Sequence, residues 1–262
     1  MRRRLWFDNV CLSDYGLWIS GDYTEALAEH LGEGVHIPGR SGDYWIDEGA
    51  HANLTLEYPA FLLGATEREL QGRLRSLRQV LGGASGYVRI EDDYHPDEYR
   101  MGRYVSGLAE QTSYYSRASE FHLAFDCKPQ RYLRSTRPLV LADQETEGAP
   151  GDLVTDNPSV LRNPTGREAR PMLRLFYDDR TAPMSVTFGD CLIVCQPCGH
   201  YCIGIDMEAR TCYYNGENLS RYVSITKGGA VAMDYPAIGD RVEITRGTNC
   251  KAVQVYPRWW WL

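Results

Sequence analysis

A period-two alternation of apolar and polar residues restricts the fold of this 262-residue chain more than any other feature of its sequence. Successive side chains of a β-strand point to opposite faces of a sheet, so each alternating run predicts a strand with one buried face. Such runs occur at residues 53–58, 120–125, 172–177, 241–245 and 251–256. Turn-forming pairs separate them, namely Pro38-Gly39, Asn163-Pro164, Asn215-Gly216 and Gly228-Gly229. The sequence therefore predicts a mainly β protein.

One segment follows a helical period instead. Residues 66–83 read TERELQGRLRSLRQVLGG, in which Thr66 and Glu69 have the spacing of a capping box and Gly82 and Gly83 are typical of a helix end. Leucines recur at helical spacing, at Leu70, Leu74, Leu77 and Leu81. We predict one helix whose leucine stripe packs on another element. Its other faces form either a solvated surface or a surface for a partner, and they carry Arg68, Arg73, Arg75 and Arg78.

A change of composition divides the chain into two parts. Residues 133–170 are rich in Pro, Gly, Asp, Thr and Asn, and strand patterning resumes at Met172. We predict a β-rich N-terminal domain with one α-helix at residues 1–134 and an all-β C-terminal domain at residues 135–262. Short strands with regular turns are typical of a β-sandwich, so the second domain is expected to be one.

Charge and hydropathy exclude several classes of function. The net charge is -7 and no basic run is longer than Arg2 to Arg4, whereas phosphate contacts need concentrated Lys and Arg, so we expect no nucleic-acid binding. No apolar run approaches the roughly 20 residues of a membrane-spanning helix, so we expect no membrane insertion. Asp8 and Asn9 interrupt the apolar stretch that a signal peptide needs, which predicts a non-secreted protein with reduced cysteines. The 18 tyrosines favour a chain in contact with partners.

Residues 191–202 read CLIVCQPCGHYC, a cluster that raises the question of a bound metal. An iron–sulfur cluster of a radical enzyme would use Cys191, Cys195 and Cys198, but position 197 is proline and no βα repeat follows. A zinc site would use Cys195, Cys198, His200 and Cys202. Structural zinc sites usually pair two knuckles, and the cysteines that follow the cluster, Cys212 and Cys250, do not form a second one.

The interpretation that we favour for this cluster is a strand, a turn at residues 196–200 and a second strand. In such a strand Leu192 and Val194 share one face, while Cys191, Ile193 and Cys195 share the other. Cysteine then acts as a small buried hydrophobic residue. We therefore expect buried thiols and no metal or other cofactor.

Residues 91–99, EDDYHPDEY, form an acidic segment. It lacks the alternating ligands and the central glycine of a calcium loop. Pro96 followed by Asp97 instead favours a hairpin connection between two strands.

The motifs of common enzymes are missing from the sequence. Ser224 and Lys227 match S-x-x-K without its partner motifs, and no G-x-S-x-G, G-x-x-x-x-G-K-[ST] or H-E-x-x-H occurs. Asp206 and Glu208 are more typical of a turn than of the facing carboxylates of a glycosidase. We therefore predict that the protein is not an enzyme.

Several segments stand out when they are taken in their order along the chain. In the first half they are DYGLWIS (residues 14–20), VHIPGRSGDYW (35–45), the capped helix, EDDYHPDEYR (91–100) and FDCKPQRYL (125–133). In the second half they are RNPTGREARPML (162–173), GIDMEARTCYYNGENLS (204–220) and VYPRWWWL (255–262). Together these motifs, which span nearly the whole chain, resemble the distal tail proteins of siphophages, a family often called Dit. The cysteines of residues 191–202 are not part of the family pattern.

The resemblance implies a β-rich N-terminal domain that forms a hexameric ring around a central channel and a galectin-like C-terminal β-sandwich. In this family the ring lies between the last ring of the tail tube and the tail-tip hub, and in some phages it carries receptor-binding proteins. The implied partners are therefore further copies of the chain in a homo-hexamer, the tail tube protein, the tail-tip hub protein and a receptor-binding protein. The implied location is the virion tail tip, after assembly in the host cytoplasm.

A closed ring needs a heterologous interface, in which one patch meets a different patch of the next subunit. Exposed strand edges and the acidic hairpin are natural contributors, because pairing an edge satisfies its free backbone groups. We predict a subunit contact at or near Arg40, Asp92, Asp93, Tyr94, Pro96, Asp97 and Tyr99.

The alternative function is a carbohydrate-binding module that contacts host glycans, since exposed Tyr and Trp of a galectin-like sandwich could stack on sugars. Trp259, Trp260 and Trp261 are the obvious candidates. Consecutive residues of a strand point to opposite faces, so these three cannot form one flat platform unless the chain is irregular there. We expect at least one of them to cap a core.

Overall fold

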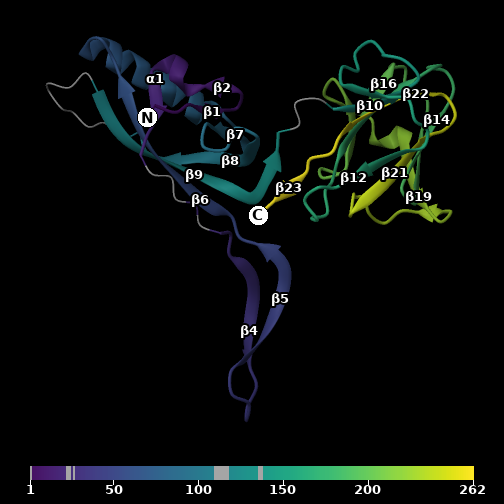
Figure 1. Cartoon of the computed structure of the whole chain (residues 1–262), viewed down its shortest axis with the longest axis horizontal. Coiled ribbons are helices and arrows are strands. Elements are labelled where there is room, and N and C mark those ends of the chain that lie inside the picture. Colours follow the sequence, from purple (N-terminus) through teal and green to yellow (C-terminus); the bar gives the residue numbers. More distant parts are fainter. Residues whose placement is uncertain (1, 22–24, 26, 109–117, 135–137) are drawn as a thin grey trace. The chain divides into compact units, whose positions relative to one another are not determined.

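The computed structural model describes residues 2–21, 25, 27–108, 118–134 and 138–262. The chain divides into two compact units, one made of Met1–Arg134 with Leu262 and the other of Ser135–Trp261 (Figure 1). Across the described residues β-strands dominate and α1 is the one α-helix, which confirms the mainly β fold class. In the same residues, no helix combines the length and the apolar character that crossing a membrane requires.

The first unit contains an antiparallel sheet in the order β2-β1-β7-β8-β9-β6-β3. Its strands are β1 (Leu5–Phe7), β2 (Val10–Cys11), β3 (Leu17–Ile19), β6 (Leu54–Leu63), β7 (Val88–Asp92), β8 (Glu98–Ser106) and β9 (Ala118–Leu133). A short 3-10 helix, η1 (Leu12–Tyr15), precedes β3. The strands predicted at residues 53–58 and 120–125 lie in β6 and β9, whose pairing runs from Leu54 opposite Cys127 to Leu63 opposite Ala118.

Helix α1 (Glu67–Gly83) covers the core of this unit as its leucine stripe predicts. All four predicted leucines are buried in one cluster with residues of β6 and β9 such as Leu56 and Phe125. Full burial of a leucine side chain stabilises a protein by about 1.5–3 kcal/mol, so burial of this stripe favours docking of the helix on the sheet. The capping box is confirmed, since Thr66 Oγ1 accepts from Glu69 N at 3.2 Å and Glu69 Oε2 accepts from Ala65 N at 2.9 Å.

Two details of the helix differ from the prediction. Gly82 and Gly83 are its last helical residues rather than its stop, and the chain leaves the helix at Ala84 with φ −75°, in the extended region. Two arginines turn back onto the protein instead of facing solvent alone: Arg73 donates to Leu63 O at 2.7 Å and Arg78 to Leu108 O at 3.4 Å. A long arginine side chain can reach backbone carbonyls beyond its own helix. The helical period of a sequence predicts only the face on which a residue lies, so it cannot predict such contacts.

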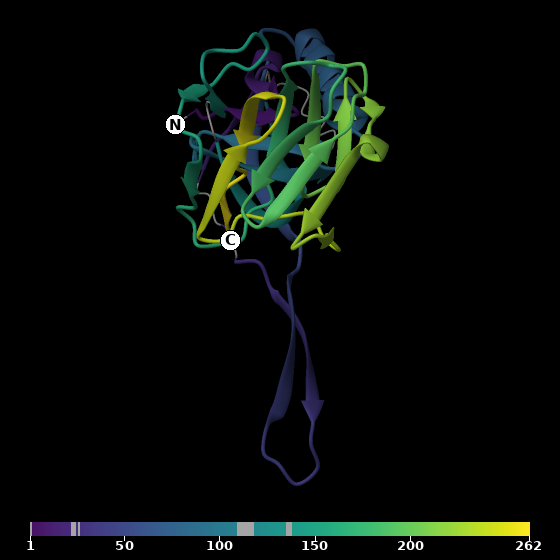
Figure 2. The same ribbon diagram turned by 90° about the vertical axis from the view of Figure 1, so that its right-hand side faces the viewer.

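Strands β4 (His30–His36) and β5 (Asp43–His51) form a separate two-stranded antiparallel sheet, which we call the arm. Figures 1 and 2 show it as a long twisted ribbon. Nearly every residue of the arm is exposed. Its tip is the predicted Pro38-Gly39 turn, in which Arg40 N donates to Ile37 O at 3.1 Å and Gly39 has a positive φ of 81°.

The second unit is a β-sandwich of two sheets. The seven-stranded sheet, in the order β11-β10-β22-β13-β16-β17-β18, is made of β10 (Leu139–Ala142), β11 (Asp152–Val154), β13 (Met172–Tyr177), β16 (Cys202–Asp206), β17 (Thr211–Tyr214), β18 (Glu217–Asn218) and β22 (Cys250–Tyr256). The six-stranded sheet, in the order β12-β21-β14-β15-β19-β20, is made of β12 (Ser159–Arg162), β14 (Met184–Phe188), β15 (Cys191–Cys195), β19 (Val223–Lys227), β20 (Ala230–Val231) and β21 (Arg241–Arg246). The remaining elements are η2 (Ser220–Tyr222) and β23 (Trp260–Trp261). The strands predicted at residues 172–177, 241–245 and 251–256 are confirmed as β13, β21 and β22.

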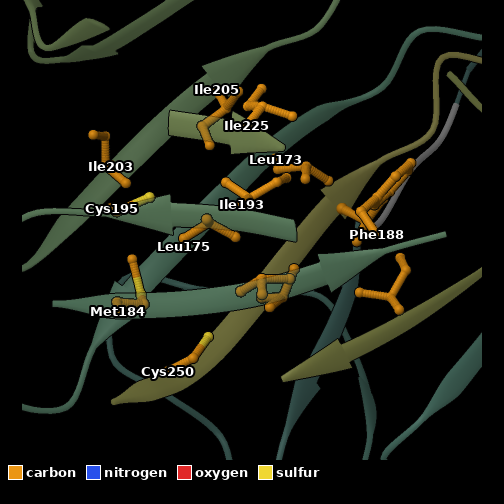
Figure 3. Packing of buried hydrophobic residues seen from close by; sticks show 14 of the residues in the cluster. Leu173, Leu175, Met184, Phe188, Ile193, Cys195, Ile203, Ile205, Ile225 and Cys250 are labelled. Atoms are coloured by element: carbon orange, nitrogen blue, oxygen red, sulfur yellow. The ribbon is translucent and has the colours of Figure 1, made fainter. Parts of the chain in front are cut away.

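One apolar core fills the space between these two sheets (Figure 3). The seven-stranded sheet contributes residues such as Leu175 and Ile203, and the six-stranded sheet contributes Met184 and Ile193. A smaller cluster lies apart from this core and contains Val140, Ala142, Ala149, Phe176, Cys202 and Ala252. Since neighbours along β13 and β22 alternate between the two clusters, the second cluster marks the other face of the seven-stranded sheet.

Two predicted glycine turns connect hairpins of this sandwich. Asn215 and Gly216, between β17 and β18, have φ values of 47° and 84°, and Gly228 and Gly229, between β19 and β20, have values of 58° and 85°. Two successive positive φ angles are those of a type I′ turn, which matches the twist of paired strands.

Candidate interaction surfaces

The acidic segment is the turn of a hairpin, as predicted, between β7 and β8. The carboxylate of Asp92 holds it together: Oδ1 accepts from the backbone N–H groups of Tyr94 at 2.8 Å and His95 at 2.9 Å, and Oδ2 accepts from Tyr58 Oη at 2.7 Å. Asp92 is only 8% exposed. Its oxygens are therefore committed to the turn and the core.

Three other residues predicted at the subunit contact have partners in the first unit. Asp93 accepts from Arg4 N at 2.7 Å and pairs with the Arg4 guanidinium at 3.1 Å. Burial alone would raise the pKa of Asp93, but the hydrogen bonds and the charge of Arg4 outweigh it and lower that pKa. The ring of Tyr94 lies 4.0 Å from the Arg3 guanidinium, and Tyr99 stacks on Tyr132 with ring centroids 5.2 Å apart.

The other predicted contact residues are exposed. Pro96 and Asp97 form the outer end of the acidic turn, and Arg40 lies at the tip of the arm. The structure thus divides the predicted set into residues that shape the turn and residues that a partner can reach.

A buried ionic network lies beneath this turn. Arg131 on β9 donates to Glu98 Oε2 at 2.8 Å and to Glu25, and Arg100 on β8 donates to Glu25 and to Pro129 O at 2.6 Å. The side chain of Arg100 is 6% exposed and that of Arg131 is 9% exposed. Because Glu25 lies in the chain between β3 and β4, the network ties the root of the arm to the sheet. Nothing in the sequence around Glu25 indicates this role, although Arg131 belongs to the FDCKPQRYL segment.

The arm presents apolar side chains to solvent. They are Leu31, Val35, Ile37, Tyr44, Trp45 and Ile46. Cross-strand pairs between histidine and aspartate flank them, with His36 Nδ1 3.3 Å from Asp43 Oδ1 and His30 Nδ1 3.1 Å from Asp47 Oδ1. Both strands of a two-stranded sheet have an unpaired edge, so the arm combines open backbone groups with an exposed apolar surface.

The cysteine cluster adopts the predicted strand, turn and strand, with Cys191, Ile193 and Cys195 buried on one face of β15. The four residues of the zinc alternative do not converge. Cys195 lies in the core between the sheets, Cys202 lies in the smaller cluster, and His200 Nε2 is 3.1 Å from Glu217 Oε2. Burial raises the pKa of the Cys195 thiol, which disfavours the thiolate that a metal would need. Among the described residues no group of three or more His, Cys, Asp or Glu side chains fits a metal ion.

The residues that carried weak enzyme motifs have structural roles. Asp206 Oδ1 accepts from Glu208 N at 3.0 Å and Ala209 N at 2.9 Å, which confirms that this segment closes a turn. Ser224 and Lys227 lie three positions apart on β19, so their side chains leave opposite faces of the strand.

The three tryptophans at the end of the chain have different surroundings. Trp259 packs against the core of the sandwich, which confirms the expectation that one of them caps a core. Trp260 Nε1 donates to Glu168 O at 2.8 Å, and Trp261 is 38% exposed. They therefore do not form a single platform for a sugar.

Comparison with solved structures shows that this fold is similar to that of hub and baseplate proteins of phages. The Dit protein of phage SPP1, described as a paradigm of the hub adsorption apparatus in phages that infect Gram-positive bacteria, is similar over 97% of each chain, with a TM-score of 0.64 and 15% sequence identity. Chains of the phage P2 baseplate in its activated conformation are also similar over 97% of each chain, with TM-scores of 0.57 at 10% identity for the calcium form and 0.56 at 11% identity for the strontium form. No protein-family model and no curated protein matches the sequence. The resemblance seen in the sequence motifs is thus confirmed at the level of the fold.

Proposed function

We propose that this protein is a distal tail protein, a structural component of a phage tail tip rather than an enzyme. Its subunits form a hexameric ring that joins the tail tube to the tail-tip hub and the receptor-binding apparatus. In the virion the ring lies at the tail tip, after assembly in the host cytoplasm. The observation that carries the proposal is the similarity to SPP1 Dit over 97% of both chains, which includes both units.

The arm supports assembly into a ring. A monomer that exposes Trp45, Ile46 and two unpaired strand edges carries a surface suited to association. In the proposed ring the arm of one subunit meets the acidic turn of the next, so the contact joins two different patches and is heterologous. Heterologous contacts build rings when the rotation between subunits closes.

The predicted contact residues divide into two roles in this proposal. Arg40 at the arm tip and Asp97 with Pro96 at the acidic turn reach the neighbouring subunit, while Asp92, Asp93, Tyr94 and Tyr99 hold the acidic turn in shape. Arg40 and Asp97 carry opposite charges, so a contact between them would be electrostatically complementary.

Native mass spectrometry of the full, untagged chain tests the proposal. We expect a metal-free hexamer. Arg40→Glu and Asp97→Arg are each expected to weaken the hexamer, because each places like charges at the contact, and the double variant is expected to recover part of it. Arg162→Glu, an exposed residue of β12, serves as the control.

The possible outcomes test two parts of the proposal separately, namely the existence of the ring and the residues of its subunit contact. A hexamer that all four variants leave unchanged would remove Arg40 and Asp97 from the contact without removing the ring. A chain that stays monomeric alone and in the presence of its tail tube protein would contradict the ring itself.

A further inference from the structure

A groove lies in the second unit, apart from the arm and the acidic turn. It consists of two depressions of about 580 and 300 Å³ that share Thr146, Asp178 and Lys251 among their lining residues. The segment 143–148 lines one side and the segment between β21 and β22 lines the other. Phe176, which lies on the face of the seven-stranded sheet away from the main core, also lines it. We therefore call it the outer groove. Volumes of this size match those of small-molecule sites.

An aromatic side chain stands in the larger depression. Tyr201 is 41% exposed and therefore offers ring surface to a ligand. Its ring packs edge to face on Tyr214 with centroids 5.4 Å apart, and Tyr214 in turn stacks on His200 at 4.5 Å. These neighbours hold the Tyr201 ring in place, so a ligand that stacks on it need not order it first.

Groups of both charge signs surround this ring. Arg180 lies with its guanidinium 5.9 Å from the Tyr201 centroid, and Lys251, Asp178 and Glu147 line the same depression. Gly148, with φ of 78°, is a neighbour of this ring, since a Cβ built there would be in ordinary van der Waals contact with Tyr201 Oη at 3.7 Å. Cations, carboxylates and a tyrosine hydroxyl thus line the same open depression.

A buried arginine lines the smaller depression. The Arg246 side chain is 7% exposed, and its guanidinium pairs with Asp143 at 2.7 Å. Its buried Nε has no hydrogen-bond partner in the part of the chain that the structure describes. Leaving a buried N–H of a charged group without a partner costs free energy, so a ligand or water with an acceptor oxygen is favoured there.

The chemistry of the groove selects one class of ligand. Hydroxyl groups donate and accept, so a polyhydroxylated molecule can use closely spaced cations and carboxylates at once. A polyanion such as a nucleic acid would meet the carboxylates of Asp143, Asp178 and Glu147. The C–H face of a sugar ring is apolar and suits the ring of Tyr201.

We propose that the outer groove is a binding site for a neutral oligosaccharide, with one sugar ring on Tyr201 and its hydroxyl groups between Lys251, Asp178 and Arg246. The site adds a direct contact with surface glycans to the structural role proposed above. It does not depend on ring formation, since all its residues belong to one unit of one subunit.

Saturation-transfer NMR of the full chain with maltotriose, chitotriose and lactose, followed by titration of the sugar that binds, tests this inference. We expect a dissociation constant in the millimolar range or below for at least one sugar. Tyr201→Ala and Lys251→Ala are each expected to weaken binding at least about tenfold, which corresponds to about 1.4 kcal/mol. Both residues are exposed, so the variants are expected to fold, and thermal unfolding checks that they do.

Tyr44→Ala is the matched control, because Tyr44 is a 55% exposed tyrosine on the arm. It is expected to bind the sugar like the unchanged protein. Absence of binding by all three sugars at millimolar concentration overturns the proposal, as does binding that Tyr201→Ala leaves intact. Equal loss in Tyr44→Ala and Tyr201→Ala also overturns it, because the sugar would then stack on exposed tyrosines without a built site.

Discussion

Tyr58 on β6 donates a hydrogen bond from Oη to Oδ2 of Asp92 on β7, over 2.7 Å, and both residues are buried. The two strands are not neighbours in the sheet, so this bond connects the acidic turn to the core rather than to an adjacent strand. Since the other oxygen of Asp92 binds two backbone N–H groups of the turn, the core determines the shape of a surface loop.

Removal of the Tyr58 hydroxyl is expected to destabilise the first unit. Tyr58→Phe leaves the buried carboxylate of Asp92 with one partner fewer, at a cost of about 1–3 kcal/mol in the free energy of unfolding. Urea unfolding of the full chain measures it. The control is Tyr44→Phe, which removes an exposed hydroxyl and is expected to change stability by less than about 0.5 kcal/mol. Equal stability of the two variants would contradict the role of this bond.

The pair formed by Arg258 and Asp206 makes the second unit sensitive to acid. Burial would raise the pKa of Asp206, but two hydrogen bonds from Arg258, each 2.7 Å, together with backbone N–H groups, lower it instead. A carboxylate whose pKa is lowered in the folded state stabilises the protein at pH values above the pKa that the same group has in the unfolded chain, about 3.9. That contribution is lost as the pH falls through the folded pKa.

Arg258→Gln is therefore expected to destabilise the second unit by about 1–3 kcal/mol near neutral pH and to move its acid unfolding to a higher pH. Without the guanidinium of Arg258, burial has the larger effect on the pKa of Asp206 and acts to raise it. Calorimetry of the full chain between about pH 3 and pH 7 follows this change. Arg162→Gln, at an exposed residue of β12, is the control. If Arg258→Gln left the midpoint pH of acid unfolding unchanged, the Arg258–Asp206 pair would not be the source of the acid sensitivity.

Thiol labelling distinguishes buried cysteines from accessible ones. Of the eight cysteines, six are buried, and only Cys11 and Cys198 are half-buried. Burial raises the pKa of Cys127 and of Cys250 to about 12, so neither forms much thiolate at pH 8. We expect rapid labelling of Cys11 and Cys198 alone in the folded protein and of all eight in urea, as peptide mass spectrometry would show. Rapid labelling of Cys250 in the folded chain would contradict the packing of the sandwich.

Polar substitution of the arm is expected to affect assembly and not folding. Trp45→Ser removes an apolar side chain that is 55% exposed in the single chain, so the stability of the monomer should change by less than about 0.5 kcal/mol. The hexamer, in contrast, should lose most of its population in native mass spectrometry. Met233→Ser, at an exposed methionine of the second unit, is the control and should leave the hexamer intact. Hexamers that tolerate Trp45→Ser would place the contact elsewhere.

The sequence alone determined the features that depend on near neighbours. Alternation located strands such as β13, and the leucine stripe with its Thr66 cap located α1, because period and capping act within a few residues. The glycine turns at Asn215-Gly216 and Gly228-Gly229 followed from φ angles that few other residues adopt. The alternation of Cys191 and Cys195 toward one face of β15 followed from the same local rule.

Only the tertiary structure decided which distant groups meet. Glu25 pairs with Arg131 across 106 residues, and Tyr201 lines the same groove as Lys251, although no local pattern connects them. Cys195 and Cys202 are close in sequence, yet they lie in different apolar clusters. Cys195 points into the core between the two sheets, whereas Cys202 lies on the opposite face of β16 from Ile203, which belongs to that core. Burial and partner choice depend on how sheets stack and on which strands lie side by side, and these arise from the free energy of the whole chain rather than from any segment.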